Sequence, residues 1–247
     1  AAGLIIYTDP AESGYTTGLL YPERGYANDT CIERGSLMTL PYAGDALTPG
    51  TEATKDANRL DAAAIPHCAL AGHSMGSLIA LHLAATAPQR VTRLALVGSV
   101  FPMPVAPALL DQAQNNPSAA HALINQWSFA PASLLGRSAV PGLNLAAVNE
   151  RLLQRQPLAT LPQALQACNA YAGGFDAATR IACPTLLLSA AQDRMTPPKA
   201  LAPLLAAFPP ALMPQRVVIP GAGHAMMNEA PGPVLEALTQ FMNAPPA

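Results

Sequence analysis

Charged residues are scarce in this chain, at 11% of its 247 residues against a typical share of about 25%. The 13 basic and 15 acidic residues leave a net charge of −2, and no basic cluster stands out along the sequence. A nucleic acid would find few positive charges to contact, so we expect no nucleic-acid partner. Hydrophobic residues make up 51%, which is typical of a folded chain with a large apolar core.

Long hydrophobic runs are also missing. Every apolar stretch is broken by Gly, Pro or a polar residue well before the ~18 residues that a membrane-spanning helix needs. The first residues, AAGLIIYTDP, lack the basic start and the long apolar region of a signal peptide. We therefore expect a cytoplasmic protein without a membrane segment.

Cysteine is rare as well. The four cysteines show no CxxC and no Cys/His spacing of a zinc site, and they are Cys31, Cys68, Cys168 and Cys183. Buried free thiols in a reducing cytoplasm are the expectation, with an exported protein as the alternative. The sequence also lacks G-x-G-x-x-G and a P-loop, which argues against a dinucleotide or nucleoside triphosphate ligand. We expect neither a metal nor a cofactor.

Short apolar runs bounded by chain breakers predict strands. They lie at Leu4–Tyr7, Ser36–Leu40, Cys68–Ala71, Leu94–Val97, Thr185–Ser189 and Arg216–Ile219. Helical patterns occur between and after them at Thr51–Ala64, Ser77–Thr86 and Val234–Met242. Strands that alternate with helices indicate a mostly parallel sheet with helices on both faces, so we predict an α/β fold.

The stretch from residue 101 to residue 178 breaks this alternation. It opens with FPMPVAP and shows no good strand, but it has helix-like segments at Pro107–Asn116, Ser118–Trp127, Leu145–Gln156 and Pro162–Tyr171. An all-helical insertion between two strands, rich in proline at its joints, is typical of a cap. We therefore predict a core formed by residues 1–100 and 179–247 and an all-helical cap at 101–178.

A glycine-flanked serine lies between a predicted strand and a predicted helix, in the sequence Gly72-His73-Ser74-Met75-Gly76. A serine hydroxyl is a poor nucleophile until a base accepts its proton and the backbone projects it clear of the sheet. A sharp turn from strand to helix projects it, and the two glycines relieve the crowding of such a turn. The turn also directs the first N–H groups of the helix at a developing oxyanion. Ser74 is therefore the candidate nucleophile and Met75 a candidate oxyanion-hole donor.

Two further polar residues follow predicted strands. Asp193 comes just after the strand at Thr185–Ser189, and His224 follows the strand at Arg216–Ile219. Sites in parallel sheets gather at the carboxyl ends of the strands, so we expect the side chains of Ser74, Asp193 and His224 at one edge. A nucleophile, an acid and a base at one edge would suit acyl transfer.

These motifs resemble the α/β-hydrolase superfamily, particularly its small capped esterases and enol-lactonase-like members. The resemblance rests on GHSMG at 72–76, QDRMTP at 192–197 and GAGH at 221–224, in the order Ser, Asp, His that the family uses. It implies an α/β-hydrolase fold with a cap over the catalytic edge and no cofactor. It also implies that Ser74, Asp193 and His224 form a catalytic triad.

The resemblance covers residues 65–100 and 180–247, is loose in the cap and is poor before Ile65. It implies a chain that begins at the third strand of the family, with the first two strands absent. Family members follow this strand with His-Gly and a residue whose N–H completes the oxyanion hole, whereas LIIY here leads into Thr8-Asp9-Pro10. Because proline has no N–H, Asp9 is the candidate second donor beside Met75.

The predicted function is the hydrolysis of a small-molecule carboxylic ester or lactone through an acyl-enzyme on Ser74, with His224 as base and Asp193 as orienting acid. Lactone opening, C–C bond hydrolysis and metal-free perhydrolysis on the same scaffold are the alternatives, as is a binding protein with weakened catalysis. Large apolar side chains usually serve core packing. With that reservation, the candidate pocket residues are His73, Met103, Leu109, Leu110, Trp127 and Phe129.

Overall fold

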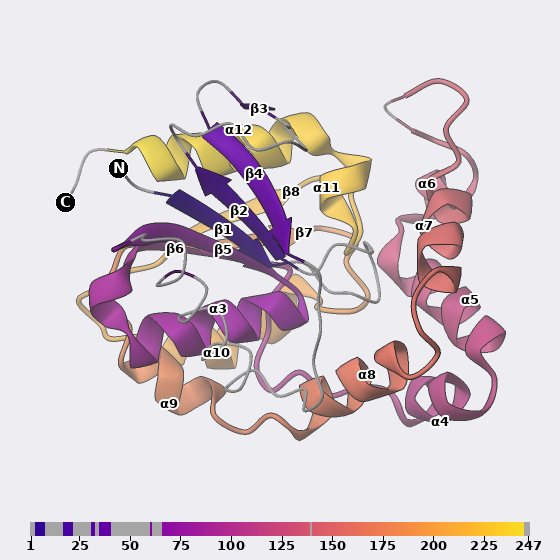
Figure 1. The fold of residues 1–247 in the computed structure, drawn as a ribbon, viewed down its shortest axis with the longest axis horizontal. Helices are drawn as coiled ribbons and strands as arrows, with labels where there is room; N and C mark the ends of the chain where they lie inside the picture. Colours follow the sequence, from indigo (N-terminus) through magenta and orange to yellow (C-terminus); the bar gives the residue numbers. More distant parts are fainter. Residues whose placement is uncertain are drawn as a thin grey trace.

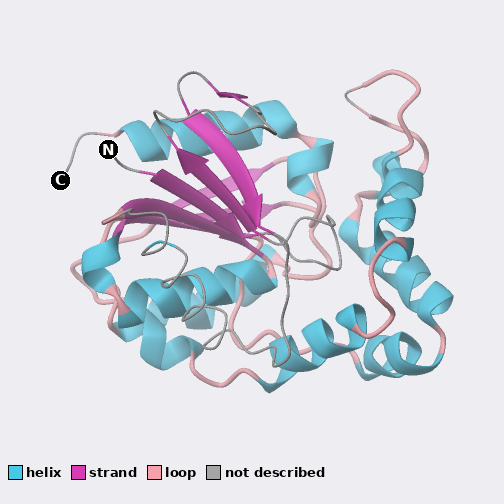
Figure 2. Ribbon diagram, in the orientation of Figure 1, coloured by secondary structure: helices cyan, strands magenta, loops and turns pink. Residues whose placement is uncertain are grey.

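The structure is a computed structural model that describes residues 3–7, 17–21, 31–32, 35–40, 60, 66–138 and 140–244. Its described part contains an eight-stranded sheet with helices on both faces (Figure 1, Figure 2). Asp9 and the predicted helix at Thr51–Ala64, except Leu60, lie outside the described residues.

The strands, in chain order, are β1 (Gly3–Tyr7), β2 (Thr17–Tyr21), β3 (Cys31–Ile32), β4 (Gly35–Leu40), β5 (Cys68–His73), β6 (Val91–Val97), β7 (Thr185–Ala190) and β8 (Gln215–Ile219). Their order across the sheet is β3-β4-β2-β1-β5-β6-β7-β8. From β1 to β8 neighbouring strands run parallel, whereas β2, β4 and β3 extend the sheet beyond β1 in antiparallel pairs. All six predicted strands are present, and the predicted α/β class is confirmed.

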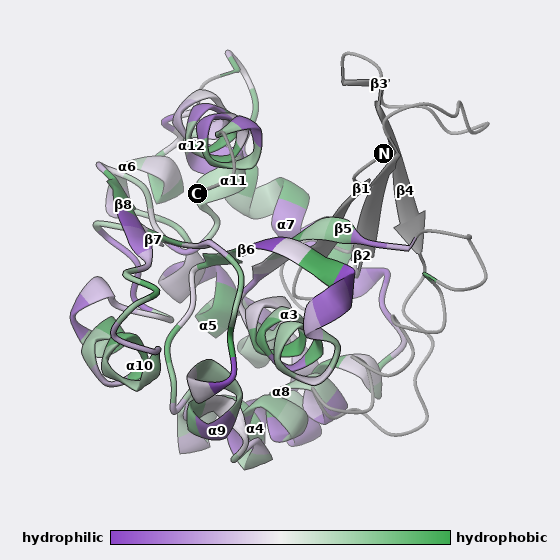
Figure 3. Cartoon of the chain, turned by 90° about the vertical axis from the view of Figure 1, so that its left-hand side faces the viewer, coloured by the Kyte–Doolittle hydropathy of each residue, from purple (hydrophilic) through white to green (hydrophobic). Residues whose placement is uncertain are grey.

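Apolar clusters cover both faces of the sheet. Along β6, Leu94 and Leu96 contact one cluster and Ala95 and Val97 contact the other, because successive side chains of a strand point to opposite faces. The first face carries α3 (Met75–Thr86), α9 (Gly174–Thr179) and α10 (Ala202–Ala207), and the second carries α12 (Pro231–Asn243) (Figure 1). Helix α3 is hydrophobic almost all round (Figure 3) because it packs between the sheet and α9.

Between β6 and β7 the secondary structure of the described chain is helical. The helices before α9 are α4 (Pro107–Asn115), α5 (Pro117–Ser128), α6 (Pro131–Leu134), α7 (Leu145–Gln154) and α8 (Thr160–Ala170). They lie beyond the carboxyl ends of the parallel strands (Figure 1). The last helix of the segment, α9, packs against α3 and α10, while the predicted division into core and cap stays a prediction.

Proline and asparagine mark several helix starts in this region. Helices α4, α5 and α6 all begin with proline, whose missing N–H is not needed in the first turn and whose fixed φ suits a helix. Asn116 and Asn144 precede α5 and α7, and their side chains accept hydrogen bonds from the N–H groups of Ala119 and Ala147. Such caps satisfy backbone donors that have no partner inside the helix.

Three shorter helices complete the described chain, and they are η1 (Pro88–Arg90), η2 (Pro198–Leu201) and α11 (Met226–Glu229). Among the helices of the described residues, none has both the length and the apolar character that crossing a membrane requires. Cys68 and Cys183 are free thiols.

Candidate active site

Ser74 occupies the turn between β5 and α3 with φ 53° and ψ −124°. Left-handed φ is unfavourable for a residue with a side chain, so the surrounding structure must hold this conformation. The Ser74 N–H donates to the Val97 carbonyl at 3.0 Å, which attaches the turn to β6. A Cβ on Gly72 would lie 2.2 Å from the backbone oxygen of Gly76, so the turn closes only with glycine at that position.

The Ser74 carbonyl is held by the first turn of α3. It accepts a hydrogen bond from the Ser77 N–H at 2.9 Å and another from the Ser77 hydroxyl at 2.5 Å. The Ser77 hydroxyl is also hydrogen-bonded to that of Ser99, at 2.7 Å. These contacts fix the backbone that carries the Ser74 side chain.

Asp193 and His224, the predicted acid and base, form a hydrogen-bonded pair whose side chains are fully buried. The Nδ1 atom of His224 lies 2.8 Å from Oδ2 of Asp193. The Thr196 hydroxyl donates to the same carboxylate oxygen at 2.7 Å, and the N–H groups of Met195 and Thr196 donate to Oδ1 at 2.9 and 2.7 Å. The loop after β7 thus surrounds the carboxylate with donors.

This environment lowers the pKa of Asp193 to about 2. Burial is the largest single influence and raises the pKa, but the attraction of His224 and the hydrogen bonds from His224 and Thr196 together outweigh it. Asp193 is therefore ionised at neutral pH. A carboxylate that accepts from Nδ1–H of an imidazole leaves Nε2 to act as the base.

His73 contacts the backbone and the ring of His224. Its Nε2 lies 3.0 Å from the His224 carbonyl oxygen, and the two ring centroids are 4.6 Å apart. Burial, and secondly the neighbouring His224, lower the pKa of His73 to about 3, so its imidazole is neutral at pH 7. A neutral ring bonded to a carbonyl carries its proton on Nε2, so His73 donates to His224.

The nucleophile candidate lines the same cavity as the loop that holds the acid. Ser74 lines a cavity together with Met195 and Thr196, and Thr196 is hydrogen-bonded to both Asp193 and His224. The structure therefore pairs Asp193 with His224, 31 positions apart, and places Ser74 at a cavity that Thr196 also lines.

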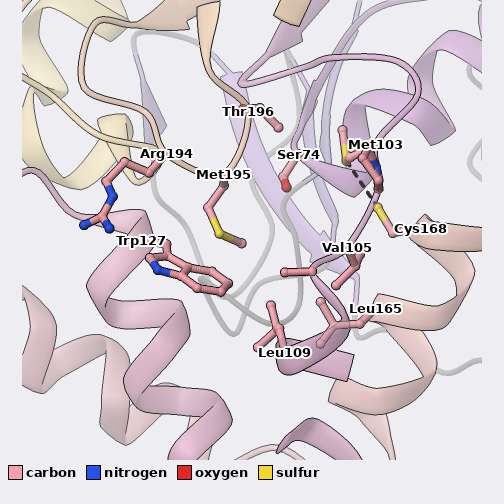
Figure 4. Close-up of a pocket in the computed structure, with 12 residues that line it drawn as sticks. Ser74, Met103, Val105, Leu109, Trp127, Leu165, Cys168, Arg194, Met195 and Thr196 are labelled. Atoms are coloured by element: carbon pink, nitrogen blue, oxygen red, sulfur yellow. Dashed lines mark hydrogen bonds between the residues drawn. The ribbon is translucent and has the colours of Figure 1, made fainter. Parts of the chain in front are cut away.

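The cavity has a volume of about 140 Å³ and extends from Ser74 toward the inserted helices (Figure 4). Three of the predicted pocket residues, Met103, Leu109 and Trp127, line it. Sequence reasoning missed several others, namely Pro104, Val105, Ala106, Leu165, Cys168, Arg194, Met195 and Thr196. The run from Arg194 to Thr196 could have been found because it directly follows Asp193.

The other three predicted pocket residues pack elsewhere. Phe129 is buried with Leu145 and Ala225 in a separate apolar cluster, and Leu110 packs against the cluster formed by α4, α5, α7 and α8. His73 contacts His224 instead of the cavity. Phe129 and Leu110 illustrate that large apolar side chains more often serve packing than binding.

Of the two candidate oxyanion-hole donors, the structure describes Met75 but not Asp9. Met75 is buried and begins α3, where backbone N–H groups lack partners within the helix. Asp9 lies outside the described residues, so the second donor stays a prediction. Within the described chain, no three His, Cys, Asp or Glu side chains are grouped closely enough to hold a metal ion.

Comparison with known proteins agrees with this geometry. The sequence profile of the alpha/beta hydrolase fold family matches residues 55–231, which is more than half of the chain. A RutD protein of Klebsiella pneumoniae (strain 342), whose name puts forward carbamate hydrolysis, is 33% identical over 178 residues. That match covers 67% of this chain and 62% of the relative, so the chain matches less than two thirds of the relative's length.

Solved structures show the same fold. A thermophilic esterase superposes with a TM-score of 0.73 at 23% identity, over 92% of each chain. The enol-lactonase from Burkholderia xenovorans LB400 superposes with a TM-score of 0.74 at 14% identity, over 98% of this chain and 91% of the other. The strand order, the turn at Ser74 and the matched profile lead to one conclusion: the chain belongs to the α/β-hydrolase family.

Proposed function

We propose that this protein is a serine hydrolase that cleaves carboxylic esters through an acyl-enzyme on Ser74. Two observations support the proposal, namely the buried hydrogen bond between Asp193 and His224 and the apolar cavity that Ser74 lines together with Thr196. Membership of the α/β-hydrolase family favours hydrolysis as the reaction class.

In the proposed reaction, Nε2 of His224 accepts the hydroxyl proton of Ser74 while the serine oxygen attacks the ester carbonyl. The tetrahedral intermediate collapses when His224 returns this proton to the departing alcohol. A water molecule then attacks the acyl-enzyme by the same route and releases the carboxylic acid. The Met75 N–H is the proposed donor to the oxyanion.

The ionised Asp193 supports each of these proton transfers. It holds the imidazole in the tautomer that carries hydrogen on Nδ1, and it stabilises the imidazolium that forms when Nε2 accepts a proton. Because the pKa of Asp193 is about 2, the carboxylate keeps its charge throughout the neutral pH range.

The cavity suits a short apolar acyl group. Its walls come largely from the segment between β6 and β7, which we propose as the cap, through side chains such as Met103, Leu109 and Trp127. A volume of about 140 Å³ is close to the ~150 Å³ of an engineered cavity that binds benzene. An acyl chain of about four to six carbons is therefore the proposed fit.

Carbamate hydrolysis is a second candidate because the RutD relatives carry that activity in their names. The same serine, base and acid can attack a carbonyl that bears nitrogen, and a lactone offers them the same carbonyl within a ring. A lactone also releases an alcohol, which stays attached to the acyl group, whereas a carbamate differs from an ester by the nitrogen on its carbonyl.

A substrate panel tests the proposal. It contains 4-nitrophenyl acetate, butyrate, hexanoate and decanoate, a simple lactone and an N-alkyl carbamate, each measured with the wild type and with Ser74→Ala. We expect the highest kcat/KM with butyrate or hexanoate and a loss of about 10⁴-fold or more in Ser74→Ala. Undiminished turnover by Ser74→Ala would contradict the role of Ser74 as the nucleophile. Turnover of the carbamate and of none of the esters would favour carbamate hydrolysis over ester cleavage.

A further inference from the structure

The end of helix α5 is attached to the loops that carry both the acid and the base. We call residues 126–130 the α5 corner. On the acid side, Arg194 follows Asp193 directly, and its Nη1 donates to the carbonyl of Gln126 at 3.1 Å. The corner also contains Trp127, which lines the cavity together with Ser74.

On the base side, the backbone of the α5 corner touches the loop of His224. The N–H of Ala225 donates to the carbonyl of Ser128 at 2.9 Å. A Cβ on Gly223 would lie 2.6 Å from that carbonyl oxygen and 2.8 Å from the nitrogen of Ala130, so there is no room for a side chain between the two segments.

Glu229 links the same two segments through its carboxylate. Oε1 accepts a hydrogen bond from the Ala130 N–H at 2.8 Å, and Oε2 accepts one from the Gly223 N–H at 2.6 Å. Hydrogen bonds to an ionised acceptor are shorter and roughly twice as strong as bonds between neutral groups. Glu229 thus holds the residue before His224 and the α5 corner at a fixed separation.

We propose that Glu229 is a positioning residue, which couples the placement of His224 to the cavity wall at Trp127. This inference rests on the proposed function, since it takes His224 as the base and the cavity as the acyl site. Movement of the α5 corner displaces Trp127 and, through the Glu229 carboxylate, the backbone next to His224. An acyl group that packs against Trp127 therefore aligns the base with Ser74.

The primary test is Glu229→Gln. The amide keeps the size of the carboxylate but has one acceptor oxygen, and its NH₂ group faces a backbone N–H that it cannot accept. We expect kcat/KM for butyrate and hexanoate esters to fall about 10- to 100-fold, as a misplacement of about 1 Å does. The matched control is Glu236→Gln on α12, where the exposed carboxylate accepts from Gln240 within the same helix; it keeps wild-type activity.

A spectroscopic signal separates positioning from a general loss of stability. Trp127 is the single tryptophan of the chain, so its fluorescence reports the α5 corner. Glu229→Gln should shift the Trp127 emission to longer wavelength and increase its quenching by acrylamide, at temperatures well below unfolding. In a Ser74→Ala background, butyrate binding should change the emission less when Glu229 is also replaced.

Two further variants keep the test decisive. Glu229→Asp retains the charge but is one methylene too short to reach both N–H groups, so its kcat/KM should lie between those of Glu229→Gln and the wild type. It also replaces Glu229→Gln as the test variant if Glu229→Gln does not fold. In the double variant Trp127→Ala with Glu229→Gln, the two effects on hexanoate ester turnover should be less than additive. Activity of Glu229→Gln and Glu229→Asp equal to that of Glu236→Gln would overturn the proposal, as would a loss of activity with unchanged Trp127 fluorescence. The fluorescence measurement needs no turnover, so its outcome stands apart from that of the substrate panel.

Discussion

His73 is expected to make folding stability depend on pH below neutrality. Burial, followed by the neighbouring His224, lowers the pKa of His73 from 6.5 to about 3 in the folded state, while an unfolded chain keeps a value near 6.5. Between these two values the unfolded chain binds a proton that the folded chain excludes. The stability is therefore complete above pH 6.5 and declines as the pH falls toward 3.

The size of the effect follows from the same shift. Each pH unit within the window corresponds to about 1.4 kcal/mol of unfolding free energy. Between pH 6.5 and pH 4.5 the loss attributable to His73 is thus about 3 kcal/mol. The lowered pKa of Asp193 acts in a separate window, because its contribution is lost only as the pH falls below about 4 toward 2.

The assay is urea unfolding of the wild type and of His73→Gln at pH 7.0, 5.5 and 4.5. Glutamine retains a side-chain N–H that can donate to the His224 carbonyl but has no group that titrates in this range. We expect the wild type to lose about 3 kcal/mol more than His73→Gln between pH 7.0 and 4.5. The control His67→Gln, at a partly exposed position before β5, should follow the wild type. If the unfolding free energies of the wild type and of His73→Gln fall by the same amount between pH 7.0 and 4.5, the buried, neutral imidazole is refuted.

Two further predictions concern the acid and the turn. Asp193→Asn should lower kcat about 10⁴-fold because the imidazole adopts the wrong tautomer. In the double variant with His224→Ala the loss should be little larger than in His224→Ala alone, since the two residues act as a unit. Steady-state losses that multiply in the double variant would contradict a shared role for Asp193 and His224. Gly72→Ala places a Cβ 2.2 Å from the backbone oxygen of Gly76, so chemical denaturation should show a loss of about 2 to 3 kcal/mol. Gly232→Ala, with nothing within 4 Å of the added Cβ and a position in helix α12, should be at least as stable as the wild type, and equal stability of the two variants would contradict the tight turn.

Much of the fold could be predicted from the sequence because its central strands are continuous apolar runs. β5 and β7 are buried along their whole length, and such runs bounded by Gly, Pro or polar residues are easily recognised. β2 (TGLLY) and β3 (CI) were missed, since five or two residues without a clear alternation carry little signal.

The acid–base pair could also be predicted, since Asp193 and His224 each follow a recognisable strand and parallel strands end at one edge. The roles of His73 and Glu229 could not. His73 contacts the backbone of a residue 151 positions away, and Glu229 acts through the corner of a helix that sequence alone does not place.

Pocket residues were the least predictable part of the site. Leu109 and Leu110 are neighbours in α4, but consecutive residues of a helix point about 100° apart, so only one of them reaches the cavity. Which one does so depends on how α4 packs against α5 and α8. That packing is a property of the assembled helices rather than of any local pattern.

The central claim is that Ser74 is the nucleophile, and covalent trapping tests it most directly. The wild type would be treated with a fluorophosphonate that carries a short alkyl chain, digested and analysed by mass spectrometry. The account predicts one adduct, on the peptide that contains Ser74, and no adduct in Ser74→Ala. An adduct on another residue, or labelling that persists in Ser74→Ala, would contradict it.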